Sequence, residues 1–171
     1  MSSDINSYIL SFLTNNIDNG YQQFTAKLIP NIASESILGV RMPILRKFCR
    51  ELNKRDDVDI FLTSLPHEFH EQNLIHAILL SGMKDFEKAI VELDRFLPHV
   101  TNWAVCDIMS PKCFKKNKDR LMAKIIEWSA SDATYTSRFG IEMLMSHFLD
   151  DDFSPAALEL PAKVESTEYY V

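Results

Sequence analysis

Apolar residues recur along the chain at the spacing of amphipathic helices, in one segment after another. In the first segment Ile5, Ile9 and Leu13 lie four positions apart, which places them on one face of a helix. Glycine and proline separate the segments: Gly20 closes the first, and Pro43 opens the third as a first-turn proline. About ten helices are predicted in this way, at 5–17, 21–29, 43–52, 58–65, around 74–79, 86–97, 103–109, 121–128, 141–148 and 155–164.

The connections between these segments are short, and no run of strictly alternating apolar and polar positions interrupts the series. We therefore predict an all-α fold in a single domain over residues 1–171. A pair of helices with its turn takes roughly 35 to 45 residues, the size of a HEAT or armadillo unit, and such units bury their apolar faces only against neighbours. This size favours a right-handed solenoid-like stack of antiparallel helix pairs. A globular bundle is the alternative, because no motif repeats residue by residue.

Composition excludes several other classes of protein. With 171 residues, of which 46% are hydrophobic, the chain can bury one sizeable core. Four Gly and seven Pro are too few for a turn-dense β-sandwich, a collagen or a disordered tract. The three cysteines Cys49, Cys106 and Cys113 include no Cys-x-x-Cys pair, so neither a disulfide framework nor a structural zinc site is expected. No basic leader and no apolar stretch of membrane-spanning length is found, so we expect a soluble, cytoplasmic protein.

The charge is unevenly distributed. The net charge of -6 argues against a general polyanion binder. Eleven of the 18 basic residues nevertheless fall in two short stretches, 41–55 and 112–120. If both stretches share one concave face, they form a groove that follows DNA phosphates; the alternative is two solvated helix faces. The basic residues are Arg41, Arg46, Lys47, Arg50, Lys54, Arg55, Lys112, Lys115, Lys116, Lys118 and Arg120.

Two groups of residues resemble known catalytic or metal sites without meeting their requirements. The run from His67 to Glu71 is similar to the metalloprotease signature His-Glu-x-x-His, but its histidines are three positions apart instead of four. We interpret it as a cluster at the start of a helix and expect no metal. Cys106 with His99 would be a thiol nucleophile and its base, but nothing in the sequence brings them together, so we expect a structural cysteine.

A third group combines an aromatic ring with a carboxylate. Trp103 and Asp107 are four positions apart and therefore neighbours on one face of a helix. Such a pair suits a cationic ligand. Arg138, which precedes the apolar stripe of a later helix, is a candidate partner for the Asp107 carboxylate. The alternative interpretation is an aromatic cap with an interhelical salt bridge.

Two motifs in this sequence resemble the AlkD-like DNA alkylation repair enzymes, which are HEAT-like-repeat DNA glycosylases. The segment Gly39-Val40-Arg41-Met42-Pro43-Ile44-Leu45-Arg46-Lys47 is similar to the family's Gly-Val-Arg-x-Pro-x-Leu-Arg segment. The segment from Asn102 to Asp107 matches the family's Trp and its catalytic Asp four residues later. The segments 74–79 and 137–141 support the resemblance, which extends over essentially the whole chain in the family's order.

The resemblance implies hydrolysis of the N-glycosidic bond of N3- or N7-alkylated purines in double-stranded DNA by a monofunctional glycosylase. Asp107 would stabilise the positive charge on the sugar and position water, Trp103 would hold the cationic base, and Arg138 would contact a phosphate and orient Asp107. No cofactor is implied, and we expect a monomer. The residues expected to hold the DNA backbone are Arg41, Arg46, Lys47, Lys115 and Lys116.

The sequence also departs from the family. Family enzymes continue through further helices with another aromatic wall, whereas this chain stops at Val171. We therefore expect it to lack C-terminal helices. This ending and the acidic composition motivate an alternative hypothesis, a noncatalytic HEAT-like-repeat module that binds DNA or a protein partner.

Overall fold

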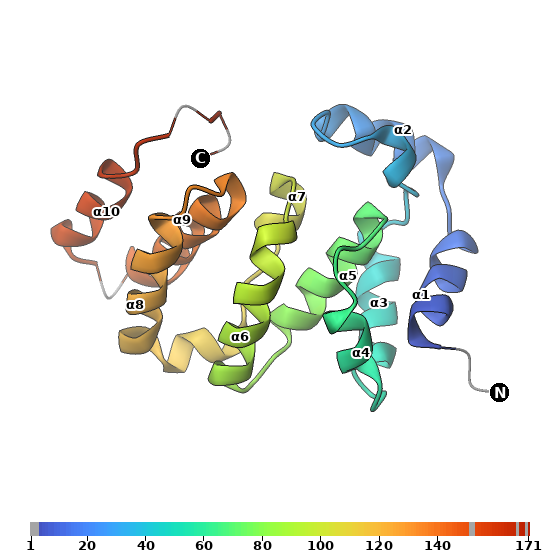
Figure 1. The fold of residues 1–171 in the computed structure, drawn as a ribbon, viewed down its shortest axis with the longest axis horizontal. Helices are drawn as coiled ribbons and strands as arrows, with labels where there is room; N and C mark the ends of the chain where they lie inside the picture. The colour runs from blue at the N-terminus through green and yellow to red at the C-terminus, as the bar shows by residue number, and fades with distance from the viewer. Residues whose placement is uncertain (1–3, 151–152, 167, 170) are drawn as a thin grey trace. The chain divides into compact units, whose positions relative to one another are not determined.

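The computed structural model describes residues 4–150, 153–166, 168, 169 and 171, and within them every regular element is a helix (Figure 1). The all-α prediction is confirmed. The chain divides into two compact units, one ending at Leu79 and one starting at Leu80. Across the described ranges, no helix has the length and apolar character needed to cross a membrane.

The first unit is built around a small aromatic and aliphatic core. Phe12 of the first helix stacks on Phe48 of the third, with ring centroids 3.6 Å apart. Ile9, Leu45 and Leu52 are completely buried, as the helical spacing predicts. The elements are α1 (Ile5–Thr14), α2 (Asn19–Leu28), η1 (Ser34–Ser36), α3 (Met42–Leu52), α4 (Val58–Thr63) and α5 (His70–Ser81), the last of which ends in the second unit.

The first predicted boundary is wrong, and the reason is a helix cap. The helix does not continue to Gly20; α1 ends at Thr14, and Gly20 lies inside α2. The Asp18 carboxylate accepts a hydrogen bond from the backbone N–H of Tyr21 and starts α2. A carboxylate in this position satisfies one of the N–H groups that a helix start leaves without a partner. Local capping therefore outweighs the apolar stripe that continues to Ile17.

The loop that leads into α3 is fixed by a buried carboxylate. Glu71 of α5, only 1% exposed, accepts hydrogen bonds from the backbone N–H groups of Leu38, Gly39 and Val40 at 2.9, 2.7 and 3.3 Å. Burial raises the pKa of Glu71, and these N–H groups oppose the rise. Gly39 has φ of 81°, and a Cβ there would lie 2.3 Å from the carbonyl oxygen of Asp18. Only glycine fits this position.

The histidines near the start of α5 pack into the same unit. Nε2 of His67 lies 2.9 Å from Nδ1 of His76, and the His67 ring stacks on Phe61 with centroids 4.5 Å apart. His70, the first residue of α5, is 4% exposed, and burial lowers its pKa to about 4. The segment from 67 to 71 thus serves the packing of a helix start, as the sequence interpretation proposed.

The second unit centres on the pair of helices α8 (Lys118–Ser129) and α9 (Thr134–Phe148), which run antiparallel around a short turn (Figure 1). Trp128 packs edge-on against Phe139, with ring centroids 5.0 Å apart. Pro161 lies in the first turn of the last helix, where the missing N–H has no helical partner to lose. The other elements are α6 (Phe86–Phe96), η2 (Leu97–His99), α7 (Trp103–Cys106), η3 (Lys112–Lys116), η4 (Pro155–Leu158) and α10 (Glu159–Ala162).

The two helices of this pair approach each other at a glycine. A Cβ added to Gly140 on α9 would lie 2.5 Å from Oγ and 2.6 Å from the backbone nitrogen of Ser129 on α8. Ser137, one turn earlier on α9, donates a hydrogen bond to the carbonyl of Ser129. Small side chains therefore set the distance between these helices.

The Glu71 contacts predict a large effect of a single substitution. In Glu71→Ala three N–H groups of the loop lose their buried acceptor, so we expect the free energy of unfolding to fall by about 3 kcal/mol. Urea denaturation followed by circular dichroism measures it. Glu68→Ala, at an exposed position of the same segment, is the control and should change stability by less than about 0.5 kcal/mol. Equal effects of the two substitutions would contradict this account of the loop.

The buried His70 predicts loss of stability in acid. Its pKa is about 4 in the folded chain and 6.5 as the ordinary value, so the unfolded chain binds the extra proton between these pH values. His70 therefore does not reduce the free energy of unfolding above about pH 6.5, and it reduces this free energy progressively as the pH falls from 6.5 toward 4. When the pH is lowered from 7.5 to 5, the free energy of unfolding should fall by about 2 kcal/mol more in the wild type than in the His70→Gln variant. Urea denaturation at both pH values tests this, with His99→Gln as control; a wild-type loss no larger than that of His70→Gln would refute it.

Candidate functional site

The short helix α7 places Trp103 and Asp107 one turn apart. The side chain of Asn102, 2% exposed, accepts a hydrogen bond from the backbone N–H of Val105 and starts the helix. Asp107 follows the last helical residue, and its N–H donates to the carbonyl of Trp103 at 2.9 Å. The expected helix over 103–109 is therefore shorter, yet it retains the turn that relates the two residues.

Arg138 of α9 holds the Asp107 carboxylate with two hydrogen bonds. Its Nε donates to Oδ1 at 2.7 Å and its Nη2 donates to Oδ2 at 2.6 Å. This bidentate geometry is the strongest form of a guanidinium–carboxylate contact. The contact raises the pKa of Arg138 further above its ordinary value. The structure thus pairs Asp107 with Arg138 of α9 and places Trp103 one helical turn before Asp107.

A second carboxylate, which sequence reasoning missed, lies beside this pair. Oε1 of Glu142 is 3.5 Å from Nη2 of Arg138, one helical turn away on α9. Burial raises the pKa of Glu142, the negative charge of Asp107 adds to the rise, and Arg138 opposes it. The side chains of Asp107, Arg138 and Glu142 are 29%, 23% and 25% exposed. Arg138 and Glu142 are four positions apart in the sequence, and this spacing could have predicted their contact on a helix.

Cys106 does not behave as a nucleophile. It is completely buried, and its thiol donates to the carbonyl of Tyr135 at 3.4 Å. Burial, with the charge of Asp107 acting in the same direction, raises the pKa of the thiol far above its ordinary value. A thiol that keeps its proton is unreactive, which agrees with the expectation of a structural cysteine.

The basic residues of the first stretch fall into two groups. The guanidinium of Arg41 pairs with Asp18 at 2.9 Å and lies over the ring of Tyr21, 5.0 Å from its centroid. Arg46 and Lys47 are exposed on α3, opposite its apolar face, and form no ion pair with the described part of the chain. Lys47 and Arg46 therefore present full charges to solvent, whereas the charge of Arg41 is largely balanced.

The second basic stretch shows the same division within its own unit. Lys115 and Lys116, at the end of η3, are exposed and have no ion-pair partner among residues 4–150 and the described part of the tail. Arg120 pairs with Glu87 and lies over the ring of Phe86. This stretch thus contains both cations that an acid balances and cations that no acid in the described chain balances.

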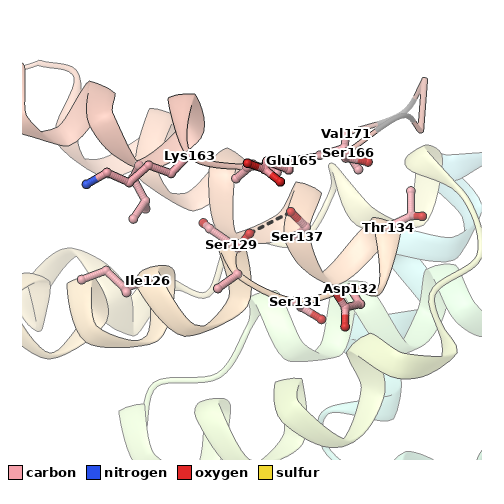
Figure 2. A pocket seen from close by; sticks show the side chains of 13 residues that line it. Ile126, Ser129, Ser131, Asp132, Thr134, Ser137, Lys163, Glu165, Ser166 and Val171 are labelled. Atoms are coloured by element: carbon pink, nitrogen blue, oxygen red, sulfur yellow. Dashed lines mark hydrogen bonds between the residues drawn. The ribbon is translucent and has the colours of Figure 1, made fainter.

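The site differs from the cavities of the second unit. A cavity of about 560 Å³ lies between α8, α9 and the C-terminal segment, lined by Ser129, Ser137, Lys163 and their neighbours (Figure 2). Another of about 460 Å³ lies beside Trp128 and Asp94. Neither is lined by Trp103, Asp107 or Arg138. The candidate site is instead a partly exposed cluster of side chains in the second unit.

Among the described residues, no group of three or more His, Cys, Asp or Glu side chains is arranged to hold a metal ion. His67 and His76 contact each other, and Glu71 accepts backbone hydrogen bonds.

Comparison with known proteins identifies the family. A family model described as DNA alkylation repair enzyme matches residues 11–167, a range that contains both the Gly39–Lys47 segment and the Asp107–Arg138 pair. No curated protein and no solved structure gives a significant match. Because the family match covers most of the chain, the protein belongs to the DNA alkylation repair enzymes, a family that acts in DNA repair.

Proposed function

We propose that the protein is a monofunctional DNA glycosylase that releases positively charged N3- or N7-alkylated purines from double-stranded DNA. The observation that carries the proposal is the Asp107 carboxylate, held in place by Arg138 and one turn from Trp103, in a chain of this family. The proposal needs no cofactor, no membrane and no partner other than DNA.

The reaction suits a carboxylate without a strong general acid. An alkylated purine already carries a positive charge, so the bond between C1′ of the sugar and the base nitrogen breaks with its electron pair going to the base. Positive charge then develops on the sugar. The Asp107 carboxylate stabilises this charge and orients a water molecule, which adds to C1′ and loses a proton. The products are the free base and an abasic site.

Arg138 and Trp103 prepare the carboxylate and the base. Two hydrogen bonds to one guanidinium leave the Asp107 carboxylate little freedom to rotate, so it needs no reorganisation when the charge develops. The face of the Trp103 ring attracts a cationic base by about 0.5 to 2 kcal/mol. The expected phosphate contact of Arg138 remains part of the proposal.

The exposed cations supply affinity for the DNA backbone. Arg46 and Lys47 in the first unit, and Lys115 and Lys116 in the second, carry charges that no acid in the described chain neutralises. Arg41 belongs to the same proposal with a smaller share, because Asp18 already pairs with it. Neutralising phosphates with such cations releases counterions and makes binding depend on salt.

The experiment that tests the proposal is release of N7-methylguanine from methylated duplex DNA. Asp107→Asn removes the negative charge and keeps the shape, so we expect the single-turnover rate to fall by about 100- to 1000-fold. Asp119→Asn, an exposed aspartate on α8, is the control and should retain the wild-type rate. Release that is undetectable in the wild type, or unchanged in Asp107→Asn, would refute the glycosylase.

A second candidate function follows from the same salt bridge. Arg138 links α9 to the end of α7, which is also what a noncatalytic helical-repeat module would use to hold its helices together. Salt-dependent duplex binding without base release supports a DNA-binding module, and no duplex binding at all points to a protein partner.

The unbalanced cations predict a change in salt dependence. If Lys47 contacts one phosphate, Lys47→Ala should reduce the slope of log affinity against log salt by about 0.9 and weaken binding equally for damaged and undamaged duplexes. Fluorescence anisotropy at salt concentrations from about 50 to 200 mM measures the slope. Lys163→Ala, whose side chain pairs with Glu159, is the control. An unchanged slope in Lys47→Ala would exclude this residue from the interface.

A further inference from the structure

The Asp107–Arg138 pair is flanked by a carboxylate to which the proposed reaction gives no role. Glu142 reaches Nη2 of Arg138, the same nitrogen that donates to Asp107. We propose that Glu142 is a specificity-determining residue, which makes the three-residue cluster net negative and thereby favours a positively charged ligand over a neutral one. This inference rests on the proposed function and deepens it.

The cluster of Asp107, Arg138 and Glu142 contains two carboxylates and one guanidinium. Asp107 and Arg138 carry opposite unit charges in a bidentate pair, so beyond direct contact with the carboxylate their fields largely cancel. Glu142 adds one negative charge. Among the described residues, the one cation in contact with Glu142 is Arg138, which Asp107 already neutralises. The excess negative charge is therefore available to a ligand.

A ligand can reach all three side chains of the cluster from solvent. Each of the three side chains is between 23% and 29% exposed. Oδ2 of Asp107 and Oε1 of Glu142 both lie close to Nη2 of Arg138, at 2.6 and 3.5 Å, so a cation bound at Asp107 also interacts with the charge of Glu142. Water screens charges in such a half-buried cluster less than it screens charges at an open surface. A single unit charge at this position is thus sufficient to alter selectivity by about tenfold.

The contacts of Glu142 contribute little to the stability of the fold. Its 3.5 Å contact with Arg138 is too long for a strong charged hydrogen bond, and ion pairs of this spacing on a helix stabilise little. Partial burial disfavours its charged form. The charge is better explained by its effect on a ligand.

The test uses two duplexes that contain stable analogues of the reaction's sugar. One carries a protonated pyrrolidine in place of the sugar, and the other carries neutral tetrahydrofuran. The wild-type protein should bind the cationic analogue more tightly than the neutral one at pH 8, as measured by fluorescence anisotropy. In Glu142→Gln this preference should fall by about tenfold, with affinity for the neutral analogue unchanged. Glu142→Asp, which keeps the charge, should restore most of the preference.

Two controls separate charge from packing. Glu159→Gln removes a carboxylate that pairs with Lys163 at the same helical spacing, at 3.3 Å, and should leave the preference as in the wild type. Glu142→Met is a second neutral variant of similar length, which should lose the preference as Glu142→Gln does. Thermal denaturation should show that these variants melt within about 2 °C of the wild type.

The possible results distinguish this inference from the function on which it rests. A wild-type preference that survives in both neutral variants, or a loss of affinity that is equal for both analogues, overturns the role of Glu142 alone. A wild-type protein that binds neither analogue more tightly than undamaged DNA overturns the proposed function and this inference with it.

Discussion

The geometry of the candidate site depends on how closely α9 approaches α8. Gly140 lies against Ser129. A Cβ at position 140 would lie only 2.5 Å from Oγ of Ser129, so any side chain there would overlap Ser129. Arg138 lies on the same helix two residues earlier. Its hydrogen bonds to Asp107 are 2.6 and 2.7 Å long, so a shift of α9 by about 1 Å would break them. A packing requirement at one face of α9 therefore positions a charged side chain on the other.

A different constraint organises the first unit, and it accounts for the Gly-Val-Arg motif. The loop at Gly39 needs a positive φ, and its N–H groups point at a buried carboxylate from α5. Because this loop is fixed, α3 begins at Met42 with Pro43 in its first turn. Arg46 and Lys47 then face solvent while Leu45 and Phe48 face the core. The exposed cations of α3 are consequently a result of how the loop before it is held.

The sequence predicted more of the fold than of the site. Helix positions followed from apolar spacing, because burial of one face is a local property of the sequence. The first helix ended early, since the Asp18 cap competes with a stripe that continues past it. The Asp107–Arg138 contact was predicted as a candidate pair, but Glu71 was interpreted only as part of a helix start. Its bonds join residues 31 to 33 positions apart, and such contacts leave no periodic signal.

The distribution of ion pairs explains how an acidic chain can present cationic surfaces. Asp18, Asp57 and Glu87 each pair with an arginine from a basic stretch, which cancels the charge of that arginine locally and leaves the net charge of the chain unchanged. The cations at Lys47 and Lys116 have no such partner in the described chain. Net charge sums over both groups, whereas a phosphate backbone responds only to the cations within a Debye length, about 8 to 10 Å. The overall charge of -6 is therefore compatible with DNA binding, because the relevant quantity is the local balance on each face and not the total.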